Sequence, residues 1–199
     1  LPHRGFQVTV SCDLENWFDT VTEQHLLAAG VPADIAEAIT LPDEQGIRRC
    51  RQGLPTSPVA TNIAAVVMDR SIVDGLIAQF GTGFAFTRYA DDMTVSFNDP
   101  LAVPFVLYCL RWDVSKMNWT IAEHKTHIQH AKAGRRIIVG IAVDDRVQQT
   151  RKTRRKLRAA TWKAAGRNKG TKPGDQITGL MAVRGIREWA ACKLPRKAR

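Results

Sequence analysis

Residues 84–97 read Phe-Ala-Phe-Thr-Arg-Tyr-Ala-Asp-Asp-Met-Thr-Val-Ser-Phe, with two adjacent aspartates, Asp91 and Asp92, near the centre. The flanking runs alternate apolar residues with small or polar ones, which is typical of strands. The stretch therefore predicts two short strands that meet in a hairpin with the aspartate pair at its tip. Aspartate is also a common turn residue, so a simple polar turn is an alternative. Converging carboxylates could instead bind Mg²⁺, which accepts one or two carboxylates together with water and phosphate oxygens.

A second acidic position ends an upstream alternating segment. Residues 7–13 read Gln-Val-Thr-Val-Ser-Cys-Asp and precede Leu-Glu-Asn-Trp-Phe, which predicts a strand that ends on Asp13 and turns into a helix. Asp13 could act as a helix N-cap, a position that aspartate favours. Together with Asp91 and Asp92, it could instead supply the third carboxylate of a two-metal site, in which the ions lie about 3.5–4 Å apart.

A loop between these acidic segments contains Gln52 and Gly53, followed by Pro55 and Pro58. Glycine allows a backbone to approach a nucleotide closely, and proline stiffens the loop. The apolar spacing that follows predicts a single helix over residues 58–79, packed on a sheet.

The wider pattern predicts an α+β fold. Helices are expected near residues 20–29, 33–40 and 102–117, and further strands near 119–122, 126–132 and 135–143. This order fits an antiparallel sheet with helices on one face, formed by residues 1–145. A separate basic helical region is expected over residues 146–199.

The charge distribution supports this division. The chain has 199 residues, a net charge of +10 and a hydrophobic content of 44%, which is ordinary for a globular protein. Residues 1–124 contain 8 basic and 15 acidic residues, a balance of −7, whereas residues 125–199 contain 21 basic and 4 acidic residues, a balance of +17. A basic excess of this size predicts a surface that binds nucleic acid.

Four arginines give this basic region a recognisable pattern. Arg151, Arg154, Arg155 and Arg158 follow i, i+3, i+4, i+7 spacing and would share one face of a helix. That face could contact phosphates. A solvated helix, or one docked on an acidic protein, is the alternative.

Two further features concern the environment of the chain. No apolar run reaches the roughly 18 residues of an uninterrupted membrane span, because Asp69, Arg70 and Asp74 interrupt the nearest candidate. We therefore expect no membrane partner. The four cysteines are widely separated and form no Cys-x-x-Cys pair, which is typical of free thiols in a reducing, cytoplasmic location.

Four motifs, taken in order, resemble those of bacterial reverse transcriptases. They are Asp13 to Phe18, Gln-Gly-Leu-Pro-Thr-Ser-Pro at 52–58, Thr-Arg-Tyr-Ala-Asp-Asp at 87–92, and Lys125 with the following threonine. The amino-acid sequences of the second and third motifs look most like those of the retron branch. One departure is Ile-Val-Gly at 138–140, where retron enzymes usually show Val-Thr-Gly. The resemblance covers roughly residues 7–165 and implies a polymerase palm followed by a helical basic thumb.

The resemblance implies roles for four charged residues. Asp13 and Asp91 match the carboxylates that bridge two Mg²⁺ ions, and Asp92 matches the supporting third carboxylate. Lys125 matches a lysine near the leaving pyrophosphate, where a cation can stabilise developing charge. An ordinary solvated lysine is the alternative for Lys125.

Other matched residues concern the nucleotide and the duplex. Phe18 matches the residue that lies beneath the incoming sugar and excludes a 2′-hydroxyl, although it could be an ordinary core phenylalanine. Gln52 and Gly53 match the loop beside the nascent base pair. The arginine face at 151–158 matches the thumb helix that follows the product duplex.

The implied activity is RNA-directed DNA synthesis on an RNA template from a DNA or RNA primer with deoxynucleotides. In this family the activity commonly serves phage defence, with a structured non-coding RNA and an effector protein as partners. Only twelve residues precede Asp13, whereas the family carries a fingers region there. That region could be lost, supplied by another chain, or absent because the sequence is a fragment. Template-independent nucleotide addition and a non-catalytic RNA-binding palm subunit are alternative functions.

Overall fold

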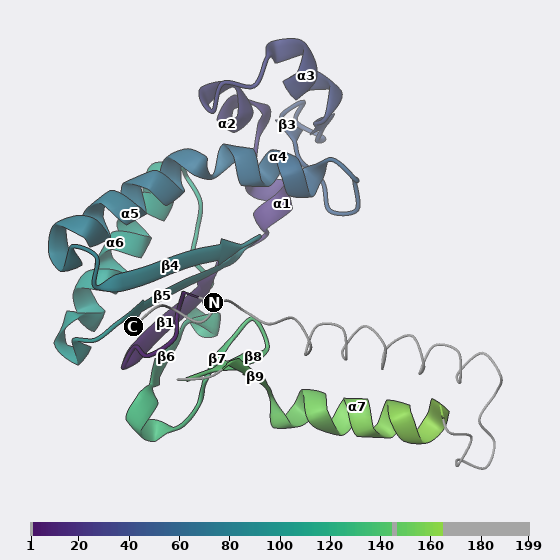
Figure 1. Ribbon diagram of the computed structural model, residues 1–199. Helices are drawn as coiled ribbons and strands as arrows, with labels where there is room; N and C mark the ends of the chain where they lie inside the picture. The colour runs from purple at the N-terminus through teal and green to yellow at the C-terminus, as the bar shows by residue number, and fades with distance from the viewer. Residues whose placement is uncertain (1, 145–146, 165–199) are drawn as a thin grey trace.

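A four-stranded antiparallel sheet forms the centre of the computed structural model, which describes residues 2–144 and 147–164 (Figure 1). The strand order is β4 (Phe84–Tyr89), β5 (Asp92–Phe97), β1 (Val8–Asp13) and β6 (His127–His130). The predicted acidic hairpin is therefore confirmed as β4–β5, and the upstream acidic strand lies beside it. The α+β class is confirmed as well.

Helices cover one face of this sheet. Figure 1 shows α5 (Val66–Phe80) and α6 (Val103–Lys116) on the same side of the strands, and buried side chains from both helices join the core. Met68, Ile72 and Leu76 of α5 recur every fourth residue, so they form one buried stripe. Full burial of such a side chain contributes about 1.5–3 kcal/mol. Truncation of Ile72 to alanine would therefore cost about 2–5 kcal/mol.

The other face of the sheet carries a buried polar network. The imidazole of His3 lies 2.9 Å from the Ser96 hydroxyl and 2.8 Å from the Thr87 hydroxyl. Thr9 contacts Ser96 at 2.7 Å and accepts a 2.9 Å hydrogen bond from the Arg136 guanidinium. Burial, together with the positive charge of Arg136, lowers the pKa of His3 to about 4. The network thus joins the N-terminal segment and Arg136 to three neighbouring strands.

The prediction of a single helix over residues 58–79 is wrong. The structure instead has α4 (Ser57–Ala64) and α5, which meet at Ala65. Three short helices lie between β1 and α4 in the chain. They are α1 (Trp17–Thr20), α2 (Glu23–Ala28) and α3 (Ala33–Ala38). A small hairpin of β2 (Leu41–Pro42) and β3 (Arg48–Arg49) was not predicted.

The strands expected after α6 are also divided differently. Residues 119–122 contribute only an isolated bridge between Leu14 and Ile121. Two short 3₁₀ turns, η2 (Glu123–Lys125) and η3 (Ala131–Ala133), flank β6. The expected strand at 135–143 is a hairpin of β7 (Arg136–Ile138) and β8 (Ile141–Val143). It reverses at Val139 and Gly140, whose φ values of 45° and 74° lie in the left-handed region.

The basic part begins beyond a second, three-stranded sheet. This sheet consists of β7, β8 and β9 (Val147–Gln149). It is followed by α7 (Arg151–Ala164), which extends away from the central sheet in Figure 1. The expected helix is confirmed over this range, and its four patterned arginines are exposed. The division at residues 145 and 146 stays a prediction, and most of the expected C-terminal region, 165–199, lies outside the described residues. Among the described helices, none has the length and apolar character needed to cross a bilayer.

Candidate active site

The acidic residues meet where two strands end. Asp13 is the last residue of β1 and lies opposite Asp92, the first residue of β5. Tyr89 also pairs with Asp92, so Ala90 and Asp91 form a two-residue turn between β4 and β5. The Leu14 amide donates a 3.0 Å hydrogen bond to the Asp91 carbonyl. Backbone pairing therefore places all three predicted carboxylates at one edge of the sheet.

The electrostatics of this edge reflect both burial and the close approach of like charges. Burial raises the pKa of Asp92, and the negative charges of Asp13 and Asp91 raise it further. A hydrogen bond from the Thr94 hydroxyl to Asp92, at 3.2 Å, acts in the opposite direction. Mutual repulsion of this kind is characteristic of clustered catalytic carboxylates.

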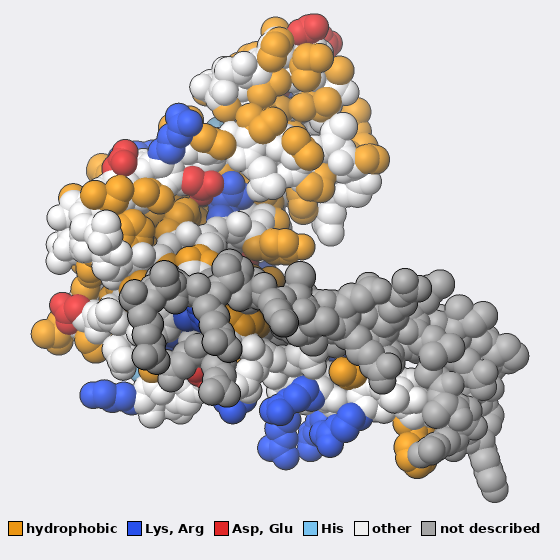
Figure 2. All heavy atoms as spheres, in the orientation of Figure 1, with side chains coloured by type: hydrophobic (Ala, Val, Ile, Leu, Met, Phe, Trp, Pro, Cys, Tyr) orange, Lys and Arg blue, Asp and Glu red, His pale blue; other side chains and the backbone are white. Residues whose placement is uncertain are grey.

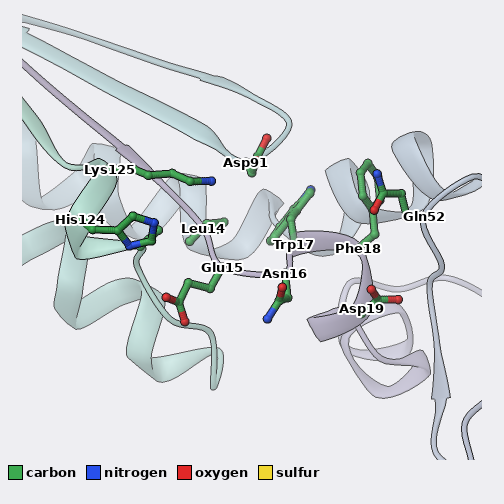
Figure 3. A pocket seen from close by; sticks show the side chains of 11 residues that line it. Leu14, Glu15, Asn16, Trp17, Phe18, Asp19, Gln52, Asp91, His124 and Lys125 are labelled. Carbon is green, nitrogen blue, oxygen red and sulfur yellow. The ribbon is translucent and has the colours of Figure 1, made fainter.

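A cavity of about 380 Å³ opens beside the turn. Its lining includes Phe18, Gln52, Asp91, His124 and Lys125. In Figure 3, the amino group of Lys125 points toward Asp91, whereas Phe18 and Gln52 lie on the other side of the cavity. The structure thus brings together residues from four separate sequence motifs.

Of the remaining predicted residues, Lys125 and Phe18 line the cavity, whereas Gly53 does not. The Lys125 amino group lies 3.5 Å from a carboxylate oxygen of Asp13, and both side chains are partly exposed to solvent. Phe18 is half-buried and packs against the core while it also lines the cavity. Gly53, next to Gln52, has a φ of 96°, a conformation that glycine adopts without strain. The arginine face of α7 does not line this cavity.

The donor set fits a divalent cation in its chemistry. Asp13, Asp91 and Asp92 offer the hard oxygen ligands that Mg²⁺ prefers, and the pKa of Asp92 is raised first by burial and then by the two neighbouring negative charges. Across the described residues, no group of three or more His, Cys, Asp or Glu side chains is already arranged around a common ion position. The carboxylates would therefore adjust their rotamers on binding, while the backbone pairing keeps their strand ends together.

One feature of the site was missed at the level of sequence. Arg88, on β4, extends to Asp69 on α5 with hydrogen bonds of 2.8–3.1 Å, and its side chain is only 7% exposed. The available signal was Asp69 itself, a partly buried carboxylate within an apolar helix, because such a charge favours an oppositely charged partner. Glu15, Asn16 and Trp17, which also line the cavity, had no distinguishing sequence signal.

The antiparallel sheet, the helices on one face and the acidic turn define the palm of a nucleic-acid polymerase. The family model described as "Reverse transcriptase (RNA-dependent DNA polymerase)" matches residues 2–157. The chain belongs to the reverse transcriptase family, and it is similar to curated reverse transcriptases of bacterial retrons.

Two of these curated relatives come from Myxococcus xanthus. Retron Mx65 reverse transcriptase is 31% identical over 179 residues, which cover 79% of this chain and 41% of the relative. Retron Mx162 reverse transcriptase is 27% identical over 238 aligned positions, covering 100% of this chain and 47% of the relative. The chain thus spans less than half the length of these relatives.

Solved structures share the fold at lower sequence identity. The Candida albicans telomerase in complex with a fragment of telomeric RNA has a TM-score of 0.57 at 12% identity, covering 92% of this chain and 40% of that chain. The foamy viral protease-reverse transcriptase in complex with an RNA/DNA hybrid also has a TM-score of 0.57, at 14% identity, covering 94% and 21%. These similarities establish the palm fold.

Proposed function

We propose that this chain provides the catalytic palm of an RNA-directed DNA polymerase. The observation that carries the proposal is the pairing of Asp13 with Asp92 next to the Asp91 turn, beside a cavity lined by Phe18 and Lys125. The membership of the reverse transcriptase family supports the same reaction. The substrates would be an RNA template, a DNA or RNA primer and deoxynucleotides.

The reaction forms one phosphoester bond and breaks one phosphoanhydride bond. The primer 3′-hydroxyl attacks the α-phosphorus of a deoxynucleotide, the hydroxyl proton is lost, and pyrophosphate departs. Two Mg²⁺ ions, when bound, would stabilise the attacking and leaving oxygens. Asp13 and Asp91 would hold these ions, and Asp92 would support them from its half-buried position.

The other cavity residues would bind and orient the nucleotide. Lys125 projects a positive charge into the cavity and could stabilise charge that develops on the pyrophosphate. Phe18 would lie beneath the sugar and exclude a 2′-hydroxyl. Gln52 and Gly53, exposed in the loop before α4, would contact the nascent base pair.

Beyond the cavity, α7 offers a surface for the duplex. Figure 2 shows Lys and Arg side chains gathered along one side of this helix. The arginine face, Arg151, Arg154, Arg155 and Arg158, is exposed. We assign this face to the phosphates of the template–primer duplex, which would position the duplex without reading its sequence.

Homopolymer templates test the proposal and separate it from template-independent addition. The full-length protein is given an oligo(dT) primer on poly(rA) or an oligo(dG) primer on poly(rC), with one radiolabelled deoxynucleotide at a time. We expect dTTP incorporation only with poly(rA) and dGTP incorporation only with poly(rC). Incorporation of either nucleotide regardless of template would identify a template-independent transferase, and no incorporation would support an RNA-binding subunit.

A further inference from the structure

The guanidinium of Arg88 connects the acidic turn to two helices. Besides its paired contacts with Asp69, it donates a 2.8 Å hydrogen bond to the Asn62 side-chain oxygen on α4. The same nitrogen donates a 2.9 Å hydrogen bond to the carbonyl oxygen of Ala90. Arg88 therefore holds the residue directly before Asp91, although it contacts neither Asp91 nor Asp92 through any of these bonds.

The conformation of Ala90 explains why such an anchor matters. Its φ is 53°, in the left-handed region that residues other than glycine seldom adopt. A conformation of this kind persists where surrounding contacts fix it. The contact from Arg88 to the Ala90 carbonyl is one of these, and the bond from the Leu14 amide to the Asp91 carbonyl is another.

Arg88 also reaches the segment that follows Asp13. Its guanidinium lies 5.6 Å from the ring centroid of Trp17, within the range of a cation–π contact. Trp17 is buried and begins α1, the element that carries Phe18. One side chain therefore contacts both the acidic turn and the segment that directly follows Asp13.

We propose that Arg88 is a positioning residue for polymerisation, one that fixes the Asp91 turn against α4 and α5 and aligns it with the segment after Asp13. The inference rests on the proposed function, because it assigns Asp91 to the cation site. Lysine could not replace Arg88, because a single ammonium cannot present the planar fork that reaches Asp69, Asn62 and the Ala90 carbonyl together.

A test must separate positioning from stability, because removal of one partner would leave the other charge buried. The double variant Arg88→Met with Asp69→Leu replaces both charges by apolar groups of similar size, which often preserves stability. The matched control is Lys116→Met with Asp113→Leu, which removes a 3.1 Å ion pair whose aspartate, on α6, is as buried as Arg88 in its own pair. Arg88→Lys is measured alongside as the conservative variant.

We expect the Arg88/Asp69 double variant to retain cooperative thermal unfolding near the wild-type midpoint but to lower kcat about 10- to 100-fold, because small misplacements of reacting groups have effects of this size. KM for the deoxynucleotide should change less than about twofold, since Arg88 holds the turn that bears a ligand rather than the nucleotide. Arg88→Lys should recover little of the lost kcat. The α6 control should keep wild-type kcat.

A second readout does not depend on turnover. Mn²⁺ binding to the protein alone, followed by electron paramagnetic resonance, should weaken several-fold in the Arg88/Asp69 variant and remain unchanged in the α6 control. If the folded variant keeps both wild-type kcat and wild-type Mn²⁺ affinity, Arg88 has no positioning role and the proposed function still stands. If the wild-type protein extends no primer, the proposed function fails, and the Mn²⁺ comparison alone decides the role of Arg88.

Discussion

At the scale of single residues, the site concentrates negative charge where ordinary packing would avoid it. Asp13 and Asp92 are paired across adjacent strands, and the turn adds Asp91. Burial is the main cause of the raised pKa of Asp92, and repulsion from the negative charges of Asp13 and Asp91 adds to it. A fold that needed only a polar turn would gain stability by replacing one of them, so this cluster favours a cation-binding function over a structural one.

Phe18 provides a residue-scale prediction about sugar selection. Phe18→Ala should reduce the preference for deoxynucleotides over ribonucleotides by about tenfold or more, because the bulk facing the cavity is lost. Competition between paired deoxy- and ribonucleotides during primer extension would measure the ratio. Phe105→Ala is a matched control, since Phe105 packs partly buried on α6 away from the cavity lining. An unchanged ratio in Phe18→Ala would assign this residue to the core alone.

Arg88 shows why part of the site could not be predicted at this scale. The aspartate pair was predictable because it interrupts an alternating pattern within a few residues of sequence. The contacts of Arg88 instead join β4 to residues 19 and 26 positions earlier in the chain. Only the fold brings these groups together, and the sequence offers no spacing rule for such contacts.

At the scale of elements, strand pairing was the most predictable feature. The alternation of apolar and polar residues over 84–97 predicted β4, β5 and their turn, and the same pattern predicted that β1 ends on Asp13. The division of the long helix at Ala65 was not predictable, because alanine has high helix propensity and marks no boundary. The turn between β7 and β8 was also not predictable, because Val139 has a φ of 45° and valine seldom adopts this conformation.

The arginine face of α7 leads to an element-scale prediction. Replacement of Arg151, Arg154, Arg155 and Arg158 by alanine should weaken binding of an RNA–DNA hybrid with little dependence on sequence. Each lost phosphate contact lowers the log–log salt slope by roughly 0.7–0.9, so four lost contacts lower it by about 3. A salt titration of hybrid binding measures this slope.

Two lysines on another side of α7 provide the matched control. Lys152 and Lys156 are exposed but lie outside the arginine face. Their replacement by alanine should change the slope by less per residue than replacement of the arginines. Identical slopes for the quadruple arginine variant and the wild-type protein would show that this face does not hold nucleic acid.

At the scale of the whole molecule, the buried network behind the sheet ties distant segments together. His3 contacts β4 and β5 through Thr87 and Ser96, while Arg136 of β7 contacts Thr9 of β1. Arg136 also donates a 3.0 Å hydrogen bond to the His3 carbonyl. The second sheet, which leads into α7, is thereby fixed to the sheet that carries the acidic residues.

This network predicts a pH dependence of stability. The pKa of His3 is about 4 in the folded chain against 6.5 as its ordinary value, so the unfolded state binds more protons between these values. Stability is fully present above pH 6.5 and is lost as the pH falls toward 4, by on the order of 3 kcal/mol in total. Denaturant unfolding of the wild-type protein and of His3→Gln across this range would isolate the contribution. Parallel pH profiles for the two proteins would contradict it.

Mg²⁺-dependent primer extension with Asp91→Asn tests whether the clustered carboxylates catalyse RNA-templated DNA synthesis. Asp74→Asn serves as the control, because Asp74 is an exposed aspartate on α5. We expect the rate of Asp91→Asn to fall at least about a thousandfold. The variant should bind the RNA–DNA hybrid almost as tightly as the wild-type protein. It should unfold at an equal or higher temperature, because repulsion with Asp92 is relieved. Primer extension by Asp91→Asn at the rate of the Asp74→Asn control would show that Asp91 has no catalytic role.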